Sequence, residues 1–265
     1  PPRELIPMLD ALIAASLAGR SAGTPLVRRV LKVSGRAESA VDEIAAPIYL
    51  PCEQSSPRVE TTILAAPGLV ELHLSCRTGD TDEGARAVDA LADRLEAALA
   101  PACFARDGRS LEETVGAILA ARGLWMAAAE SCTGGMVAAR MTDVAGSSAY
   151  FRGGVVAYDN AVKVEALGVG GDLLRAHGAV SEPVARAMAD GVRARLQADV
   201  AVAVTGIAGP GGGTAAKPAG TVVIAATGLG RARVRTFRFI GDRALVRAQS
   251  VQAALDAVRR LLLDL

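Results

Sequence analysis

The chain has 265 residues, of which 51% are hydrophobic and 22% charged, and its formal net charge is +1. This length suits one large or two modest domains. The sequence has no apolar run as long as a membrane span, and no basic amino-terminal region followed by an apolar stretch. It therefore predicts a protein without a membrane span or signal peptide. Because aromatic residues make up only 3%, the core must consist mainly of Ala, Val and Leu.

Charge is divided unevenly along the chain. Residues 1–107 carry 11 basic and 15 acidic residues, and residues 108–265 carry 18 and 13. A mildly basic second part favours an anionic small molecule and lacks the concentrated basic patch that is usual for nucleic-acid binding. The four cysteines have neither CxxC nor Cys/His metal spacing, which predicts free thiols in a reducing cytoplasm and no metal or cofactor.

Residues 1–107 predict a small α+β domain. The order of elements is helix, strand, helix, two strands and helix, with Pro67-Gly68 at a hairpin turn. The predicted helices are 3–17, 38–45 and 82–99, and the predicted strands are 26–33, 59–65 and 69–76. This order indicates a sheet with helices on one face, and residues 101–107 read as the junction to the next domain.

Residues 108–265 predict an α/β/α domain with a mixed sheet between two helical layers. The predicted strands are 124–129, 153–158, 199–204, 220–226 and 233–240. The predicted helices are 110–123, one from about 135, 160–167, 181–197 and 242–263. Ser110 to Glu113 forms a capping box, and Ser181 is expected to cap the helix that follows it.

The most informative run is Ala129-Glu130-Ser131-Cys132-Thr133-Gly134-Gly135, at a predicted strand-to-helix turn. Such a turn exposes a side chain and aims free backbone N–H groups at a ligand, so it suits a nucleophile or an anion cradle. The alternative is an ordinary capped loop, with Ser131 or Thr133 as the helix N-cap.

Two further strand ends carry reactive or flexible residues. Tyr158 ends one predicted strand, and Lys163 lies in the first turn of the next helix. The run 205–213, rich in glycine, follows the strand 199–204. Loops at the carboxyl ends of neighbouring strands line the binding crevice of open α/β sheets, so we expect the three segments to lie together.

These segments belong to a set of six ordered motifs, over which the chain resembles a known family. The motifs are Ala129 to Gly135, Gly146-Ser147-Ser148 with Phe151, Tyr158 to Lys163, Gly178 to Glu182, Val204 to Gly212, and Lys217 to Val222. Residues 108–265 resemble the carboxy-terminal domain of the CinA (competence/damage-inducible) family, the nicotinamide-nucleotide amidases. The resemblance implies hydrolysis of the carboxamide of nicotinamide mononucleotide to nicotinate mononucleotide and ammonia.

Residues 1–107 resemble the KH-like middle domain of longer CinA proteins. The match lies in Val33-Ser34-Gly35 and Glu38-Ser39-Ala40, and the GxxG loop of a nucleic-acid-binding KH domain is not evident. A packing or dimerisation module is therefore favoured over a nucleic-acid-binding one. We expect a homodimer, paired through the apolar stripe of the helix 82–99.

An amidase needs a nucleophile, a base and an oxyanion cradle. Ser131 is the expected nucleophile. His73 lies in the other domain and His177 is expected to cap or to lie at the surface, so a lysine is the remaining base, Lys163 or Lys217. Lys163 is favoured because it lies beside Tyr158, and desolvation can lower the pKa of a lysine toward neutrality.

Other residues have alternative roles. Tyr158 orients Lys163 or shuttles its proton, or else is a buried tyrosine with a satisfied hydroxyl. Cys132 is a rival nucleophile, but it is expected to be buried against the sheet while Ser131 faces Lys163. Glu130 holds a backbone or ribose hydroxyl, or caps the helix.

The remaining predicted contacts surround the ligand. Backbone N–H groups near Thr133 and Gly134 are the expected oxyanion cradle, and the glycine-rich loop is expected to cradle a phosphate or the pyridine amide. The alternative for this loop is a long disordered connection. The predicted binding set also contains Glu130, Cys132, Asn160, Thr205, Gly206, Gly209, Gly211 and Gly212. A non-catalytic nucleotide-binding or nucleic-acid-associated regulatory protein is the alternative function.

Overall fold

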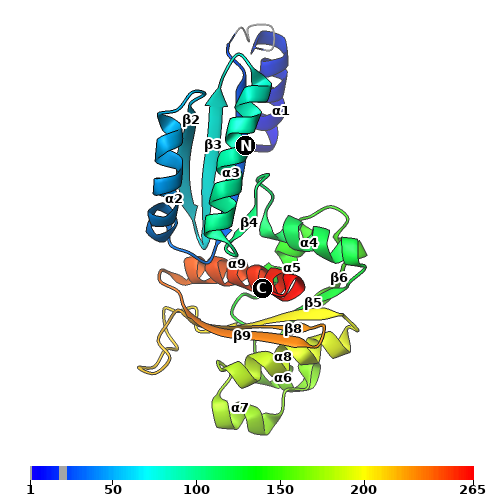
Figure 1. The fold of residues 1–265 in the computed structure, drawn as a ribbon. Coiled ribbons are helices and arrows are strands. Elements are labelled where there is room, and N and C mark those ends of the chain that lie inside the picture. Colours follow the sequence, from blue (N-terminus) through cyan, green and yellow to red (C-terminus); the bar gives the residue numbers. More distant parts are fainter. Residues whose placement is uncertain (1, 18–22) are drawn as a thin grey trace.

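The computed structural model describes residues 2–17 and 23–265. Within these residues the chain forms two β-sheets, a four-stranded sheet in the first half and a five-stranded sheet in the second (Figure 1). Helices cover one face of the first sheet and both faces of the second. The predicted fold class, an α+β domain followed by an α/β/α domain with a mixed sheet, is confirmed.

The first sheet is antiparallel throughout, with the strand order β2-β3-β1-β4. Its elements in chain order are β1 (Leu26–Ser34), α2 (Glu38–Glu53), β2 (Val59–Ala66), β3 (Leu69–Arg77), α3 (Thr81–Leu99) and β4 (Cys103–Ala105). This is the split β-α-β-β-α-β connectivity. The sequence analysis missed β4 and read it as a junction, because three residues are too few to show alternation.

The core of this domain lies between the sheet and α2 and α3. Val88, Leu91, Leu95 and Leu99 of α3 are buried against it. The apolar stripe that was expected to pair with a second copy is therefore used inside the domain. α2 runs eight residues past the predicted end, through two prolines, to Glu53.

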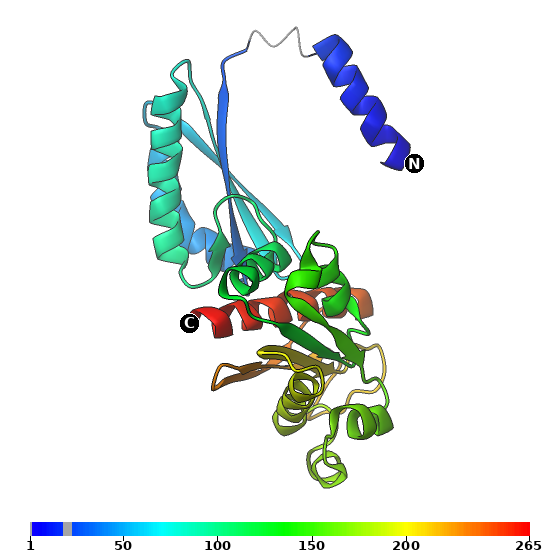
Figure 2. The same ribbon diagram turned by 90° about the vertical axis from the view of Figure 1, so that its right-hand side faces the viewer.

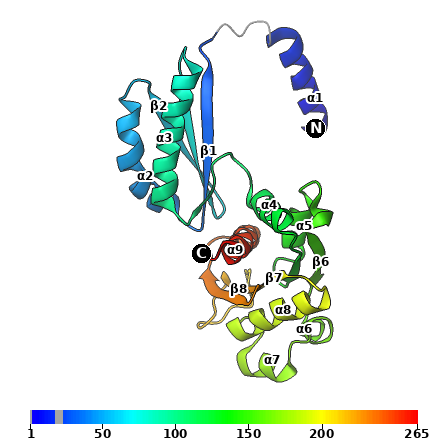
Figure 3. The same ribbon diagram turned by 45° about the vertical axis from the view of Figure 1, so that its right-hand side comes forward.

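A separate helix precedes this domain. α1 (Pro2–Leu12) continues into a π-helical turn (Ile13–Leu17), which covers the predicted helix 3–17. Figures 2 and 3 show α1 standing clear of the first sheet. Its large apolar side chains, Leu5, Ile6, Met8 and Leu12 among them, are exposed.

The second sheet has the order β6-β5-β7-β8-β9 and is mixed. Its strands are β5 (Met126–Glu130), β6 (Phe151–Val156), β7 (Val200–Gly206), β8 (Thr221–Gly228) and β9 (Arg231–Arg238). β5 runs parallel to both β6 and β7, whereas β8 and β9 are antiparallel to their neighbours. The carboxyl ends of β5, β6 and β7 therefore meet at one edge of the sheet.

Two helical layers enclose this sheet (Figure 1). One layer contains α4 (Leu111–Arg122), α5 (Met136–Thr142) and α9 (Arg243–Leu263), and the other contains α6 (Asn160–Leu167), α7 (Gly171–His177) and α8 (Glu182–Arg195). The sequence analysis did not predict α7 or the 3-10 turn Ser147–Ala149. The capping box of α4 is present as predicted. Ser181 occupies the N-cap of α8, but its hydroxyl donates to the carbonyl of Gly178 instead of capping the helix.

Helix α9 also connects the two domains. The Arg259 guanidinium is buried, binds Asp256 and donates to the carbonyl of Pro101 at 2.7 Å. Nearer the start of α9, the side chain of Gln252 lies against Gly68 in the hairpin turn of the first domain. A helix of the second domain therefore supports the first domain at two points.

No helix of the described residues is long and apolar enough to cross a membrane.

Candidate functional site

Two hydrogen bonds hold the turn after β5 to its neighbouring strands. The N–H of Ser131 donates to the carbonyl of Val204 on β7 at 2.9 Å, and the N–H of Ala157 donates to the carbonyl of Glu130 at 2.8 Å. The turn therefore lies between the ends of β6 and β7. Three of the predicted segments meet at this edge, as the parallel order of the strands requires.

Ser131 and Cys132 differ in their surroundings. Ser131 is 9% exposed, and Cys132 is 5% exposed and packs in the core between the sheet and α9. Burial raises the pKa of the Cys132 thiol to about 11, although its own backbone N–H, Arg243 and Arg247 oppose the rise. The thiol is therefore protonated at neutral pH, and the predicted burial of Cys132 is confirmed.

Glu130 caps helix α5. Its carboxylate is 1% exposed and accepts hydrogen bonds from the N–H groups of Gly135 at 2.9 Å, Val137 at 3.1 Å and Ala138 at 2.9 Å. A buried carboxylate at a helix N-terminus satisfies orphan donors and complements the helix dipole. Of the two alternatives for Glu130, the structure shows the cap, and its contact with a ligand stays a prediction.

With Glu130 as the cap, Ser131 and Thr133 are free of that role. No side-chain cap is made at Gly135, the N-cap position of α5, and the Thr133 hydroxyl is buried without a partner among the described residues. The capped-loop alternative is therefore wrong for both side chains.

The turn leaves two backbone donors open. The N–H of Gly134 donates to the carbonyl of Ser131 at 3.1 Å, so it is not available to a ligand. Within the described part of the chain, the N–H groups of Cys132 and Thr133 donate to no other residue. Of the two residues expected to form the oxyanion cradle, the N–H of Gly134 is therefore occupied, whereas that of Thr133 has no acceptor among the described residues.

Lys163 is the most unusual side chain near this turn. It lies in the first turn of α6, is 1% exposed, and donates from Nζ to the carbonyl of Tyr158 at 3.1 Å. Burial lowers the pKa of Lys163 below its ordinary value of 10.5, while the charge of Asp159, and that of Cys132 when its thiol is ionised, partly oppose the shift. The bond to the carbonyl of Tyr158 places the ammonium group just past β6, next to Ala157, which is bonded to Glu130 at the end of β5.

Helix α6, which carries Lys163, packs closely against α8. At Gly191 of α8, a Cβ atom would lie 1.9 Å from the carbonyl oxygen of Leu167, one turn beyond Lys163 on α6. Only glycine allows this approach. Asp159 caps α6 by accepting from the N–H of Ala161 at 2.7 Å, and Asn160 is an exposed first residue of the helix.

Tyr158 contacts a different partner from the one expected. Its side chain is 61% exposed, and its hydroxyl accepts from Nη2 of Arg243 at 3.1 Å. The buried-tyrosine alternative is therefore wrong. Tyr158 orients Lys163 through its backbone carbonyl, while its phenol lies at the rim of the site.

The glycine-rich loop is folded, not a disordered connection. Two backbone hydrogen bonds join the two ends of the loop. The N–H of Gly220 donates to the carbonyl of Ile207 at 2.7 Å, and the N–H of Ile207 donates to the carbonyl of Thr221 at 2.8 Å. Such a closed arch has the form of an Ω-loop. Within it, Gly209 has a φ of +83° and presents its carbonyl to Nη1 of Arg243 at 3.1 Å.

The other loop residues of the predicted binding set divide into two kinds. Thr205 is buried and donates to the carbonyl of Ala179 at 2.9 Å, and at Gly206 a Cβ atom would lie 2.7 Å from Val222. The Thr205 hydroxyl is thus used within the protein, and Gly206 allows β7 and β8 to approach closely at the base of the loop. Gly211 and Gly212 are exposed, and no described residue accepts from their N–H groups.

Two arginines of α9 were missed by the sequence analysis. Arg247 donates from Nη2 to the carbonyl of Thr133 at 2.8 Å, and Arg243 joins Tyr158 to Gly209. A signal was present, because a helix starting at Asp242 places residues 243 and 247 one turn apart on the same face.

The remaining candidates lie elsewhere. Lys217 donates to two backbone carbonyls, and the His177 side chain is exposed.

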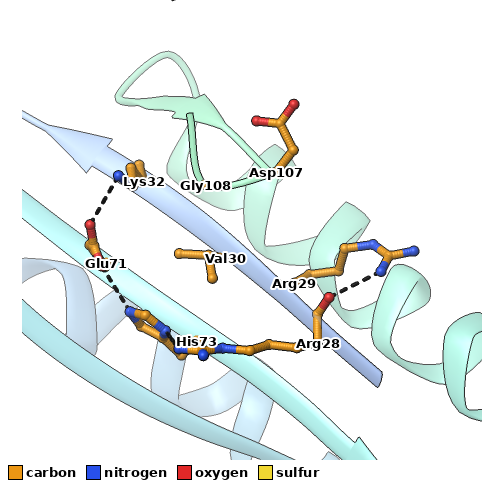
Figure 4. Close-up of a pocket in the computed structure, with 8 residues that line it drawn as sticks. All are labelled: Arg28, Arg29, Val30, Lys32, Glu71, His73, Asp107 and Gly108. Carbon is orange, nitrogen blue, oxygen red and sulfur yellow. Dashed lines mark hydrogen bonds and ion pairs between the residues drawn. The ribbon is translucent and has the colours of Figure 1, made fainter. Parts of the chain in front are cut away.

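A cavity of about 510 Å³ opens on the first sheet (Figure 4), where Lys32 and His73 both bind Glu71. None of the six motifs contributes to that cavity. Among the described residues, no three His, Cys, Asp or Glu side chains gather as metal ligands do.

The second domain is thus an α/β/α domain with a small hydroxyl nucleophile candidate and a desolvated lysine at the carboxyl edge of its sheet. The model of the CinA C-terminal domain family matches residues 108–262. The chain belongs to the CinA family.

Relatives and solved structures agree with this membership. The chain is 45% identical over 274 residues to a "Putative competence-damage inducible protein" of Symbiobacterium thermophilum, and 43% identical over 263 residues to a "CinA-like protein" of Koribacter versatilis. Each alignment covers 99% of this chain and 63% of the relative, so the chain spans less than two thirds of their length.

Among solved structures, competence/damage inducible protein CihA from Agrobacterium tumefaciens is similar with a TM-score of 0.56 at 42% identity. The match covers 57% of this chain and 93% of that one. A CinA superfamily protein from Klebsiella pneumoniae is similar with a TM-score of 0.56 at 37% identity, covering 59% of this chain and all of that one.

Proposed function

We propose that the protein hydrolyses the carboxamide of nicotinamide mononucleotide, giving nicotinate mononucleotide and ammonia. The observation that carries the proposal is that two groups lie at the same edge of the sheet: Ser131, in a turn with two N–H groups that no other described residue accepts from, and Lys163, a buried lysine whose pKa is lowered by burial. A lysine that is neutral near physiological pH can act as a general base.

In the first half of the proposed reaction, neutral Lys163 takes the proton of the Ser131 hydroxyl as Oγ attacks the carboxamide carbon. The N–H groups of Cys132 and Thr133 bind the resulting oxyanion. Collapse of the tetrahedral intermediate breaks the C–N bond, and the Lys163 ammonium returns its proton to the leaving ammonia. An ester between Ser131 and the nicotinoyl group remains.

In the second half, Lys163 takes a proton from water as the water attacks the ester carbon. The C–O bond to Ser131 then breaks, and the serine oxygen regains its proton from Lys163. The net reaction consumes one water and releases one carboxylic acid and one ammonia, which at neutral pH are present as carboxylate and ammonium. Lys163 serves as base and acid in turn, and Tyr158 holds it in place through a backbone carbonyl.

A pyridine nucleotide fits the rim of the site. Arg243 lies between the exposed phenol of Tyr158 and the glycine-rich loop, and an arginine has five donors, of which two are used here. The open N–H groups of Gly211 and Gly212 add neutral donors for a phosphate. The described cysteines are all free, which suits a reducing compartment, so we place the reaction in the cytoplasm.

The direct test incubates the purified protein with nicotinamide mononucleotide and measures ammonia and nicotinate mononucleotide. We expect equal amounts of the two products, unchanged by EDTA. Folded protein that binds the nucleotide tightly in calorimetry without releasing ammonia would support the alternative, a nucleotide-binding regulatory protein. Salt-dependent binding of single-stranded RNA by the intact protein would instead support a nucleic-acid role.

We also propose that the protein is a homodimer. The stripe of α3 is buried within its own domain, so the apolar surface available for pairing is that of α1, where Leu5, Ile6, Met8 and Leu12 are exposed. Light scattering at micromolar concentration should give twice the mass of one chain, and Leu5→Asp with Leu12→Asp should give the mass of one. A monomeric wild type contradicts the proposal.

A further inference from the structure

The loop between α7 and α8 is held by side-chain donors at four consecutive carbonyls. Lys217 Nζ donates to the carbonyl of His177 at 3.1 Å and to that of Val180 at 2.7 Å. The hydroxyl of Ser181 donates to Gly178 at 2.8 Å, and that of Thr205 donates to Ala179 at 2.9 Å. An irregular segment whose carbonyls are all bound by side chains has its conformation fixed by those side chains.

Lys217 lies within the loop that is closed between Ile207 and Gly220, whereas Thr205 precedes that closure on β7. Lys217 lies at the far end of that loop, in a tight turn where the N–H of Thr214 donates to the carbonyl of Lys217 at 2.9 Å and the N–H of Lys217 donates to the Thr214 hydroxyl at 3.1 Å. No carboxylate of the described residues lies within ion-pair distance of its ammonium group. Its contacts are therefore to backbone, and they join two loops that are otherwise separate in sequence.

The same loop is held at its near end by Arg243, which donates to the carbonyl of Gly209. Between the two cations, residues 210–216 are exposed and rich in glycine. A segment of this composition loses much conformational entropy when it is ordered, so its order depends on the contacts at its ends. At Gly213 the two sides of the arch lie so close that a Cβ atom would be 2.7 Å from the backbone nitrogen of Ala219.

We propose that Lys217 is a positioning residue of the site: by binding the carbonyls of His177 and Val180, it holds the glycine-rich loop in the conformation that binds the anionic part of the ligand. The backbone N–H groups of Gly211 and Gly212 then face the ligand without an ordering cost at the moment of binding. Lys217 takes no part in proton transfer. The expected kinetic effect rests on the proposed amidase activity, whereas the order of the loop does not.

The test compares Lys217→Met with Lys32→Met, a matched control in which the other non-catalytic lysine, paired with Glu71 in the first domain, loses its charge. Limited proteolysis with thermolysin reads the order of the loop, because Ala215 and Ala216 are cleavage sites within it. Lys217→Met should be cut there about tenfold faster than the wild type, and Lys32→Met at the wild-type rate. Unchanged cleavage of Lys217→Met overturns the proposal.

Kinetics with nicotinamide mononucleotide separate positioning from chemistry. Lys217→Met should raise KM about tenfold and leave kcat within about twofold. Loss of kcat by orders of magnitude at unchanged KM overturns the positioning role, since it would make Lys217 a proton-transfer group. If Lys217→Met does not fold, Lys217→Gln, which keeps a hydrogen-bond donor, replaces it. Its cleavage rate and its KM should then lie between the wild-type values and the tenfold increases expected for Lys217→Met. Wild-type values for both quantities overturn the proposal. If the wild type releases no ammonia, the amidase proposal fails, and the cleavage rates still decide the role of Lys217.

Discussion

The ammonium group of Lys163 binds Tyr158 at its backbone carbonyl, 3.1 Å away, and leaves the phenol of that tyrosine to Arg243. One residue thus holds the candidate base from the main chain and reaches the rim of the site with its side chain. The lysine is almost completely buried, and its charge has one direct hydrogen-bond acceptor.

The rate should report the titration of Lys163. Burial lowers the pKa of this lysine, and the base acts when neutral, so kcat/KM should rise with pH and level off at a pKa below 10.5. Cys132→Ala should give the same profile. If the Cys132 thiolate were the nucleophile, the rate of the wild type would instead keep rising toward the thiol pKa of about 11.

Replacing Lys163 by methionine should abolish activity and stabilise the fold. A depressed lysine pKa means that protonation disfavours the folded state, so the uncharged methionine side chain should raise the free energy of unfolding at pH 7. The stabilising contribution of neutral Lys163 is fully present above the unfolded pKa and is lost as pH falls through the folded one. The difference in the free energy of unfolding between Lys163→Met and the wild type should therefore become smaller as pH rises. Urea unfolding at several pH values measures it, and a destabilised variant at pH 7 contradicts the account.

Glu130 should matter for stability through its cap on α5. Glu130→Ala leaves three N–H groups without an acceptor, at a cost of about 2 kcal/mol or more in the free energy of unfolding. The exposed Glu165 of α6 provides the matched control, and Glu165→Ala should change stability by less than about 0.5 kcal/mol. Equal effects of the two substitutions would be inconsistent with a buried cap.

Arg243 should contribute to recognition of the phosphate. Arg243→Gln should raise KM for nicotinamide mononucleotide about tenfold or more, the loss expected for a charge-assisted hydrogen bond, and should change KM for nicotinamide riboside much less. Arg186→Gln on α8 is the control of equal charge change, because Arg186 is exposed and its nearest acid is 3.8 Å away. An equal rise in KM for both substrates would argue against phosphate recognition.

The sequence predicted what depends on local pattern and strand order. The parallel strands β5, β6 and β7 follow from their apolar runs, and their order along the chain brings the turns after them to one edge. The burial of Cys132 was expected because adjacent side chains at a tight turn diverge in direction; Ser131, which was expected to face the cleft, is buried as well.

The sequence did not predict contacts between distant segments. Tyr158 and Arg243 lie 85 positions apart, and Thr133 and Arg247 lie 114 apart, so no local spacing relates them. The strand β4 is too short for a periodic signal and forms because it pairs with β1. The role of Glu130 stayed open because a carboxylate beside a helix start suits a cap and a ligand equally well.

The most direct test of the account is ammonia release from nicotinamide mononucleotide by the wild type, Ser131→Ala and Cys132→Ala under identical conditions. If Ser131 forms the ester, Ser131→Ala should lose turnover by about three orders of magnitude or more. Cys132→Ala should keep a rate close to that of the wild type and lose about 1 kcal/mol of stability from its small cavity. An active Ser131→Ala together with an inactive Cys132→Ala would contradict the central claim.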